Sequence, residues 1–210
     1  MAILLDSASL DDASAAAGLG FVRGITTNPA LMARETKDPL AHLARLLEAL
    51  PEGPVFYQPT RSDAGEMDAE ARAAVALAPE RVVAKLPATL EAVTLATQLR
   101  RDGVRCALTA VYSPAQALLA HEAGCAWIIP YVDRAARHSA GAVVVEQAAV
   151  LEQLDSPTRI LAASLKSGPQ VAEAVLDGAH DVTAPLAVLC ALAGHPLTES
   201  AVREFAAHWE

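Results

Sequence analysis

One lysine, Lys85, lies inside a short apolar run, VVAKLP at residues 82–87, which is typical of a buried strand. Burying an ammonium group is costly, so this lysine must pair with a carboxylate, lose its proton, or both. An ordinary lysine is only about 0.04% neutral at pH 7, and desolvation that lowers its pKa by about three units makes about half of it nucleophilic. The run predicts either a Schiff-base nucleophile or a strand-end lysine whose stem packs while its head reaches water.

Polar side chains also stand at the ends of the other apolar runs. Tyr131 is notable because it follows the apolar segment AWIIP. Strand ends are where any chain returns to water, so polar residues also gather there without a function. The residues at these ends are Asp6, Thr26, Thr27, Asn28, Gln58, Thr109, Tyr131, Ser164 and Lys166.

The elements that position these residues alternate between strands and helices. A proline at residue 39 predicts a kink or split in the second helix, and residues 133–142 are expected to form a long loop. A last helix over residues 199–209 has no strand to accompany it. The expected strands are 3–7, 22–27, 54–58, 81–87, 105–111, 126–132, 159–165 and 181–185.

Eight strand–helix units with short connections predict an α/β protein, a (β/α)₈ TIM barrel with an extra C-terminal helix. We expect a single barrel domain over residues 1–210, with 197–210 as the terminal helix. In such barrels the active site forms at the carboxyl ends of the strands, where the polar residues gather.

Composition excludes several classes of partner. The net charge is -9 and no basic stripe is present, which argues against nucleic acid. No apolar run approaches the roughly 20 residues of a membrane span, and Asp6 comes too early for a signal peptide. Cys106, Cys125 and Cys190 are expected to be buried reduced thiols of a cytoplasmic protein.

The sequence predicts neither a metal site nor a cofactor. None of the six histidines has metal-ligand spacing to another, and G-x-G-x-x-G is absent. A phosphate group, if bound, would rely on Arg134 and Lys166, with Ser164 donating a hydrogen bond. Arg134 has an equally plain alternative as a solvated loop charge.

Four motifs in this order resemble the small transaldolase family, and within it the fructose-6-phosphate aldolases: GITTNP at 24–29, VVAKLP at 82–87, TAVYSPAQ at 109–116 and AASLK at 162–166. The resemblance runs almost from end to end. It implies a barrel in which Lys85 forms a Schiff base with a ketose donor. It also implies a decamer of two pentameric rings, with the last helix reaching a neighbouring subunit. That helix carries an apolar stripe of Val202, Phe205, Ala206 and Trp209.

The resemblance also assigns site residues. Tyr131 becomes the acid/base, acting through a water held by Gln58 and Thr109. The remaining expected residues are Asp6 in catalysis, and Thr26, Asn28, Arg134, Ser164 and Lys166 in binding a sugar or sugar phosphate.

Three positions favour aldolase over transaldolase chemistry. Transaldolases carry glutamate, asparagine and phenylalanine where this chain has Gln58, Ala107 and Tyr131. Ile129 replaces a smaller aldolase residue and is expected to narrow the pocket near the donor, and Arg61 adds a charge after strand three. The alternatives left open are a transaldolase, a sugar-phosphate isomerase barrel and a silent barrel that only binds sugar phosphates.

Overall fold

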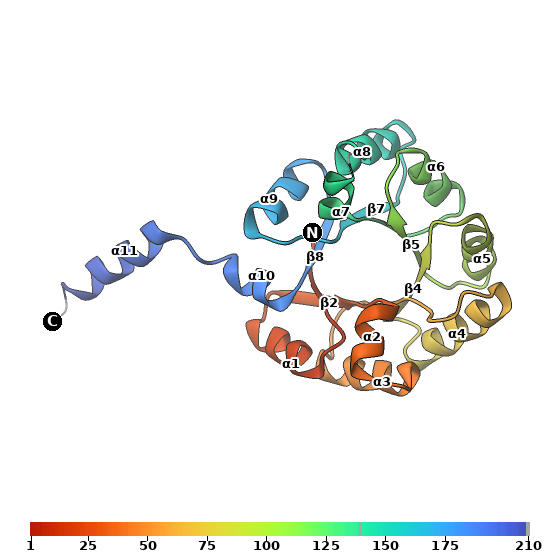
Figure 1. Ribbon diagram of the computed structural model, residues 1–210, viewed down its shortest axis with the longest axis horizontal. Helices are drawn as coiled ribbons and strands as arrows, with labels where there is room; N and C mark the ends of the chain where they lie inside the picture. The colour runs from red at the N-terminus through yellow and green to blue at the C-terminus, as the bar shows by residue number, and fades with distance from the viewer. Residues whose placement is uncertain (139, 209–210) are drawn as a thin grey trace.

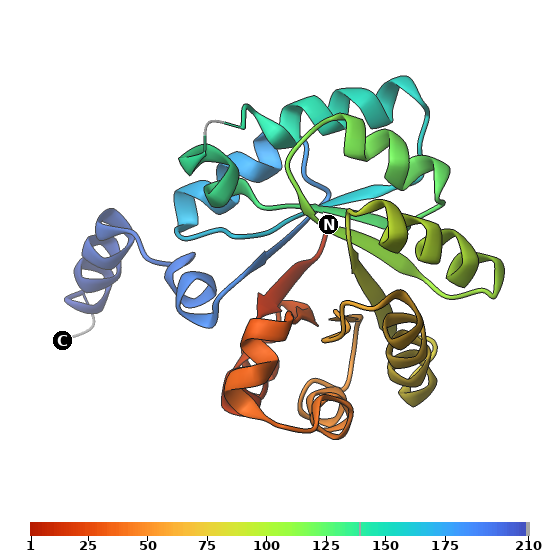
Figure 2. The ribbon, with the colours of Figure 1, turned by 45° about the vertical axis from the view of Figure 1, so that its right-hand side comes forward.

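The computed structural model describes residues 1–138 and 140–208. It confirms the predicted (β/α)₈ barrel: parallel strands pair in sequence order and the last closes on the first (Figures 1 and 2). The described residues form eight strands: β1 Ile3–Asp6, β2 Val22–Thr26, β3 Val55–Tyr57, β4 Val82–Pro87, β5 Cys106–Val111, β6 Trp127–Pro130, β7 Arg159–Ala162 and β8 Asp181–Ala184.

Helices surround the strands as an outer ring (Figure 1). None of the helices in the described part of the chain is long and apolar enough to cross a membrane. Their bounds are α1 Leu10–Leu19, α2 Pro29–Glu35, α3 Pro39–Ala49, α4 Ala64–Leu77, α5 Leu90–Arg101, α6 Ala115–Glu122, α7 Val132–Arg137, α8 Val143–Gln153, α9 Gly168–Leu176, α10 Leu186–Ala191 and α11 Pro196–Ala206.

Two apolar layers result from the alternation of side chains along each strand. Val82, Ala84 and Leu86 of β4 pack in the large layer between strands and helices. Val83 belongs to a smaller cluster of strand residues that fills the barrel interior. The register of β4 therefore places every second residue inside, and Lys85 shares the interior face with Val83.

The predicted break at Pro39 is confirmed, and local capping explains it. The Asn28 side chain accepts a hydrogen bond from the Leu31 amide and starts α2, with Pro29 in its first turn. The Asp38 side chain accepts from the Ala41 amide and starts α3 at Pro39 in the same way. Each proline lacks an N–H that a first-turn residue would leave unpaired, so both positions favour a helix start.

Two local expectations were wrong. The expected loop at 133–142 begins as helix α7, which an ion pair between Asp133 and Arg137, 2.6 Å apart and four residues apart in sequence, supports. Cys190 is exposed, unlike Cys106 and Cys125, because it lies on the short helix α10, which buries only Leu189.

The last helix projects away from the barrel. Helix α11 extends to one side of the ring of helices (Figure 1), and none of its residues is buried in the described chain. Its apolar residues Leu197, Val202 and Phe205 are 73%, 59% and 67% exposed. Trp209, which completes the predicted stripe, lies outside the described residues. The barrel therefore closes without α11.

Candidate active site

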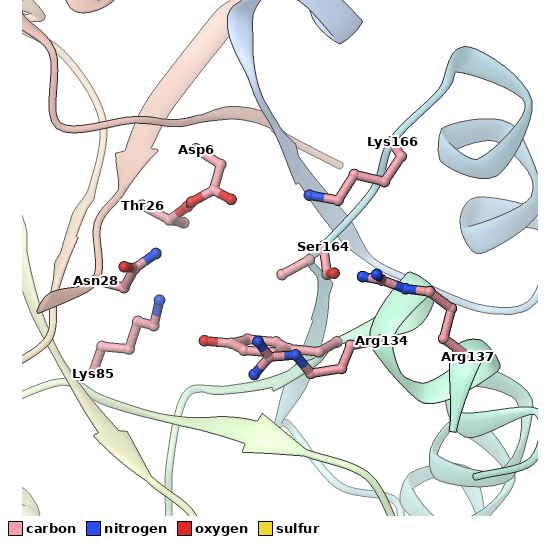
Figure 3. Close-up of a pocket in the computed structure, with 10 residues that line it drawn as sticks. Asp6, Thr26, Asn28, Lys85, Arg134, Arg137, Ser164 and Lys166 are labelled. Atoms are coloured by element: carbon pink, nitrogen blue, oxygen red, sulfur yellow. The ribbon is translucent and has the colours of Figure 1, made fainter. Parts of the chain in front are cut away.

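A polar cavity of about 180 Å³ opens at the carboxyl ends of the strands. Eight of the residues that the sequence predicted for the site line it. Figure 3 shows Lys85, Asn28, Thr26 and Asp6 on one side, facing Ser164, Lys166, Arg134 and Arg137 on the other. Gln58 lines a larger adjoining cavity that shares Asp6, Asn28, Tyr131, Arg134 and Lys166.

Lys85 is buried, and no carboxylate of the described residues lies within ion-pair distance of it. Its residue is 3% exposed, and its ammonium nitrogen Nζ donates a hydrogen bond to the Thr27 carbonyl at 2.7 Å. Burial lowers the pKa of Lys85 to about 8, while the Asp6 carboxylate acts in the opposite direction. A lysine with this pKa is about one-tenth neutral at pH 7, several hundred times the fraction of an ordinary lysine.

Tyr131 lies across the cavity at the end of β6 and is held through its hydroxyl. The fully buried Thr109 donates a hydrogen bond from Oγ1 to the Tyr131 hydroxyl oxygen at 3.2 Å. Burial raises the pKa of Tyr131, although the Thr109 hydrogen bond acts against this. The phenol is therefore protonated at neutral pH, and because its oxygen accepts from Thr109, its own proton is free for donation.

The strand ends nearest Lys85 form a small polar network. Thr26 Oγ1 donates to the Asp6 carboxylate at 3.1 Å and lies 2.8 Å from the Thr183 hydroxyl. Asn28 uses its carbonyl oxygen to cap α2, so that oxygen is fixed and the amide nitrogen is oriented at the cavity edge. This side presents a carboxylate, a hydroxyl and an amide, which suit the hydroxyl groups of a sugar.

Gln58 follows β3 and carries an unsatisfied group. Its Oε1 atom is buried and has no hydrogen-bond partner within residues 1–138 and 140–208. Buried polar atoms in proteins are nearly always paired, so an orphaned oxygen beside a cavity indicates a place for a donor from solvent or substrate.

The opposite side of the cavity is cationic. Arg134, Arg137 and Lys166 line it, together with the Ser164 hydroxyl. Ser164 has a φ of 63°, a left-handed conformation that a non-glycine residue adopts only when its surroundings hold it. Concentrated positive charge in a protein of net charge -9 favours an anionic substrate.

Comparison with known proteins places the chain in a family. Residues 3–210 match the family described as Transaldolase/Fructose-6-phosphate aldolase. The chain belongs to this family. Similar proteins named probable transaldolase occur in Desulforudis audaxviator, 38% identical over 211 residues that cover 100% of this chain and 97% of the relative, and in Symbiobacterium thermophilum, 36% identical over 212 residues with 100% and 97% covered. Another, in Pelotomaculum thermopropionicum, is 34% identical over 212 residues, with 100% and 98% covered.

Two expectations for this transaldolase-family site need correction or addition. Ile129 does not line the cavity, because it is fully buried in the interior cluster. Arg137 does line it, and the sequence does not predict this residue because it predicts a loop over 133–142. The signal was present: Arg134 and Arg137 are three residues apart, so on a helix they share a face. No cluster of three or more potential metal ligands occurs among the described residues.

Proposed function

We propose that this protein is a class I aldolase that cleaves or forms a C–C bond through a Schiff base between Lys85 and a ketose donor. The observation that carries the proposal is the buried Lys85 amine, whose pKa is about 8, at the wall of a polar cavity. Membership of the Transaldolase/Fructose-6-phosphate aldolase family supports it. The expected product is dihydroxyacetone or a related ketone.

The reaction begins with the neutral Lys85 amine. Its nitrogen attacks the donor carbonyl carbon to give a carbinolamine, which loses water to give a protonated imine. A base then removes the proton of the hydroxyl group on the carbon beyond the scissile bond. That C–C bond breaks, its electron pair moves toward the imine nitrogen, and an aldehyde leaves behind an enamine.

Tyr131 is the proposed acid/base, acting through a water held by Gln58 and Thr109. The hydrogen bond from Thr109 orients the phenol, and the orphaned Gln58 Oε1 is able to accept a hydrogen bond from that water. Protonation of the enamine carbon regenerates the imine, and hydrolysis then releases the ketone. The raised pKa of Tyr131 keeps the phenol protonated at neutral pH, so it carries the proton that this step needs.

The two sides of the cavity divide the recognition of substrate. Asp6, Thr26 and Asn28 are proposed to bind donor hydroxyl groups close to Lys85. Arg134, Lys166 and Ser164 are proposed to bind a phosphate on the aldehyde portion, with Arg137 adding a further guanidinium. The distribution of charge over the cavity supports this orientation.

Transaldolase activity is the second candidate. The names of the relatives favour it, since each is called a probable transaldolase. The two reactions share the imine and the enamine. An aldolase protonates the enamine and releases a free ketone, whereas a transaldolase keeps it until an acceptor aldehyde arrives. Gln58 and Tyr131 support the aldolase, because a phenol supplies the proton that phenylalanine lacks.

Product analysis with fructose 6-phosphate, with and without erythrose 4-phosphate, tests the choice. Free dihydroxyacetone formed without an acceptor supports the aldolase. Sedoheptulose 7-phosphate formed only with the acceptor, and no free ketone, supports the transaldolase. Borohydride reduction in the same mixtures traps the shared imine. Because the chain has lysines only at 37, 85 and 166, peptide mapping assigns the modified residue without ambiguity.

We also propose a homo-oligomer, a decamer by family resemblance, in which α11 packs on a neighbouring subunit. The exposed apolar residues of α11 and its separation from the barrel support this arrangement. Sedimentation at micromolar concentration should give a mass well above 21.8 kDa. A monomer would contradict the assembly and leave the proposed chemistry untouched.

A further inference from the structure

One carboxylate outside the cavity, that of Glu70 on α4, binds the chain on both sides of Gln58. The Tyr57 hydroxyl donates to Glu70 Oε1 at 2.5 Å. Beyond Gln58, the backbone amide of Thr60 donates to both Glu70 oxygens at 3.0 Å, and its hydroxyl lies 3.1 Å from each. Five contacts from residues 57 and 60 therefore meet at one side chain.

The alternation of β3 explains why this carboxylate controls Gln58. Phe56 packs in the barrel interior, and Tyr57 packs in the layer facing the helices. Tyr57 is 1% exposed, so its ring fixes the end of the strand against α4. Gln58, the next residue, turns back toward the cavity side. The Glu70 contacts hold the outward-facing neighbours and so set the direction of the inward-facing side chain.

Packing alone does not require these groups. A phenylalanine at position 57 would fill the same apolar layer, whereas Tyr57 brings a hydroxyl that needs a partner when buried. Burial, followed by the hydrogen bond and charge of Glu70, raises the pKa of Tyr57, so the phenol remains a donor at all pH values at which the protein is handled. The contact therefore persists wherever Glu70 is ionised.

The Gln58 side chain depends on this backbone support. Its Oε1 has no hydrogen-bond partner among the described residues, so no contact of that oxygen with the protein orients the amide. We propose that Glu70 is a positioning residue, which holds Gln58 in place through Tyr57 and Thr60 so that the amide can bind the water used in proton transfer. This inference rests on the proposed function of Gln58.

The competing explanation is purely structural, namely that Glu70 only fastens α4 to the loop after β3. The two explanations differ in what a variant loses. A structural role lowers stability and leaves the catalytic steps in proportion. A positioning role slows proton transfer to the enamine and leaves imine formation at Lys85 unchanged, because Lys85 lies on β4 and makes its contact with Thr27.

The test uses Glu70→Ala and Glu70→Gln, with Glu66→Gln as the matched control. Glu66 is an exposed glutamate one turn earlier on the same helix. For the Glu70 variants we expect imine trapping within about twofold of the wild type, while kcat for ketone release falls about tenfold and KM changes little. Glu66→Gln should match the wild type in all three quantities.

A double-mutant cycle with Gln58→Ala identifies the path of the effect. If Glu70 acts through Gln58, Glu70→Ala/Gln58→Ala should be no slower than Gln58→Ala alone. The proposal would be overturned if the losses of kcat in the two single variants multiply in the double variant. It would also be overturned if kcat is unchanged in Glu70→Ala, or if imine trapping in that variant falls in proportion to kcat. Should Glu70→Ala fail to fold, Tyr57→Phe is the second variant, and it should show the same split between trapping and kcat with a smaller loss.

Failure of the proposed function has a different signature. If the proposed function is wrong, the wild type itself gives no trapped imine, and the positioning role of Glu70 is then wrong as well. A wild type that traps the imine, beside Glu70 variants of normal turnover, would overturn only the role of Glu70.

Discussion

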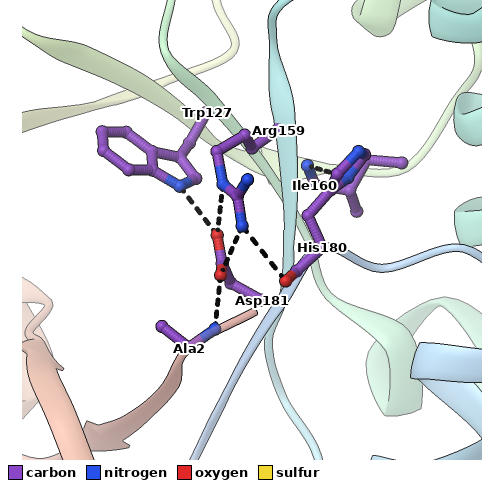
Figure 4. Close-up of polar contacts among 6 residues, drawn as sticks. All are labelled: Ala2, Trp127, Arg159, Ile160, His180 and Asp181. Carbon is purple, nitrogen blue, oxygen red and sulfur yellow. Dashed lines mark hydrogen bonds and ion pairs between the residues drawn. The ribbon is translucent and has the colours of Figure 1, made fainter.

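Among the described residues, each end of the barrel buries one charged side chain, and the two ends surround it in opposite ways. At the amino end, Asp181 is 3% exposed, the same fraction as Lys85 near the carboxyl end. Figure 4 shows the surroundings of Asp181: Arg159, Trp127 and the Ala2 amide all point at its carboxylate. Trp127 and Arg159 are the first residues of β6 and β7, Ala2 precedes β1, and Asp181 itself is the first residue of β8.

Asp181 is paired at both of its oxygens. Oδ1 accepts from the Ala2 amide at 2.7 Å and from Arg159 Nη2 at 2.8 Å. Oδ2 accepts from Arg159 Nε at 2.8 Å and from Trp127 Nε1 at 3.1 Å. Burial by itself raises the pKa of Asp181, but the hydrogen bonds from Arg159, Trp127 and Ala2 together outweigh it and lower the pKa. The carboxylate therefore stays charged.

Lys85 has the same burial and far fewer partners. Its one hydrogen bond goes to a backbone carbonyl, and no carboxylate lies within ion-pair distance in the described chain. The Asp6 carboxylate does not outweigh the effect of burial, so the pKa of Lys85 falls and the neutral amine is favoured. The comparison teaches that the number of partners decides whether a buried charge is locked into the structure or left available for reaction.

The largest expected effect on turnover comes from Lys85→Met, which removes the buried amine that lacks a carboxylate partner. Imine trapping should disappear and turnover should fall by at least about 10⁴, because the proposed nucleophile is gone. The variant should also be more stable by up to about 3 kcal/mol at pH 7, since the cost of holding the ammonium in the interior disappears.

Trapping by mass spectrometry and urea unfolding measure the two effects of Lys85→Met. Lys37→Met, at an exposed position, is the control and should change neither. Residual trapping at position 85 is impossible in the variant, so trapping that persists would place the nucleophile at another lysine. A loss of stability would mean that the buried ammonium is better compensated than its contacts indicate.

The sequence predicted the carboxyl end of the barrel better than the amino end, for physical reasons. Lys85 interrupts an apolar run and Tyr131 follows one, so the sequence alone indicates both positions. The Asp181 network is assembled from strands far apart in sequence, and only the closed barrel brings Asp181 and Trp127 together. Opposite charges at the first residues of consecutive strands, Arg159 and Asp181, were the available signal.

Short-range details were harder to predict than the barrel itself. The six residues of helix α7 carry too little periodicity to predict a helix, and without the helix nothing indicates that Arg137 lies beside Arg134. Glu70 is proposed to support Gln58 from twelve positions further along the chain, through contacts such as the one with the Thr60 amide. The residue types at these positions do not predict this contact. The hydrophobic pattern of the sequence predicts where the strands and helices lie, whereas these contacts depend on how the elements pack.

Asp181→Asn should sharpen the comparison from the other end. The amide cannot match the charge of Arg159, and its NH₂ group faces donors, so we expect a loss of about 3 kcal/mol in the free energy of unfolding. Imine trapping per folded molecule should be unchanged, because the network lies at the end opposite the cavity. Urea unfolding measures the loss, with the exposed Asp11→Asn as control within about 0.5 kcal/mol. Equal stability of the two variants would show that the paired charge contributes nothing.

The smallest expected effect, and the most direct reading of the difference between the two ends, is the pH dependence of imine formation. The neutral fraction of an amine with a pKa of about 8 rises about tenfold per pH unit below that value and levels off above it. Brief incubation with donor at each pH, followed by borohydride quenching under one fixed condition, measures the rate of imine formation at Lys85.

The stability of the fold depends on pH through the same group. Between about pH 8 and 10.5 the unfolded chain binds more protons than the folded chain. The destabilisation caused by burying Lys85 is therefore complete below pH 8 and decreases as the pH rises through this window. Asp181 behaves in the opposite sense, because its lowered pKa stabilises the fold at neutral pH and this contribution is lost only in acid. A rate that keeps rising through about pH 10 would mean that the interior does not lower the pKa of Lys85, and the contrast between the two buried charges would then lose its basis.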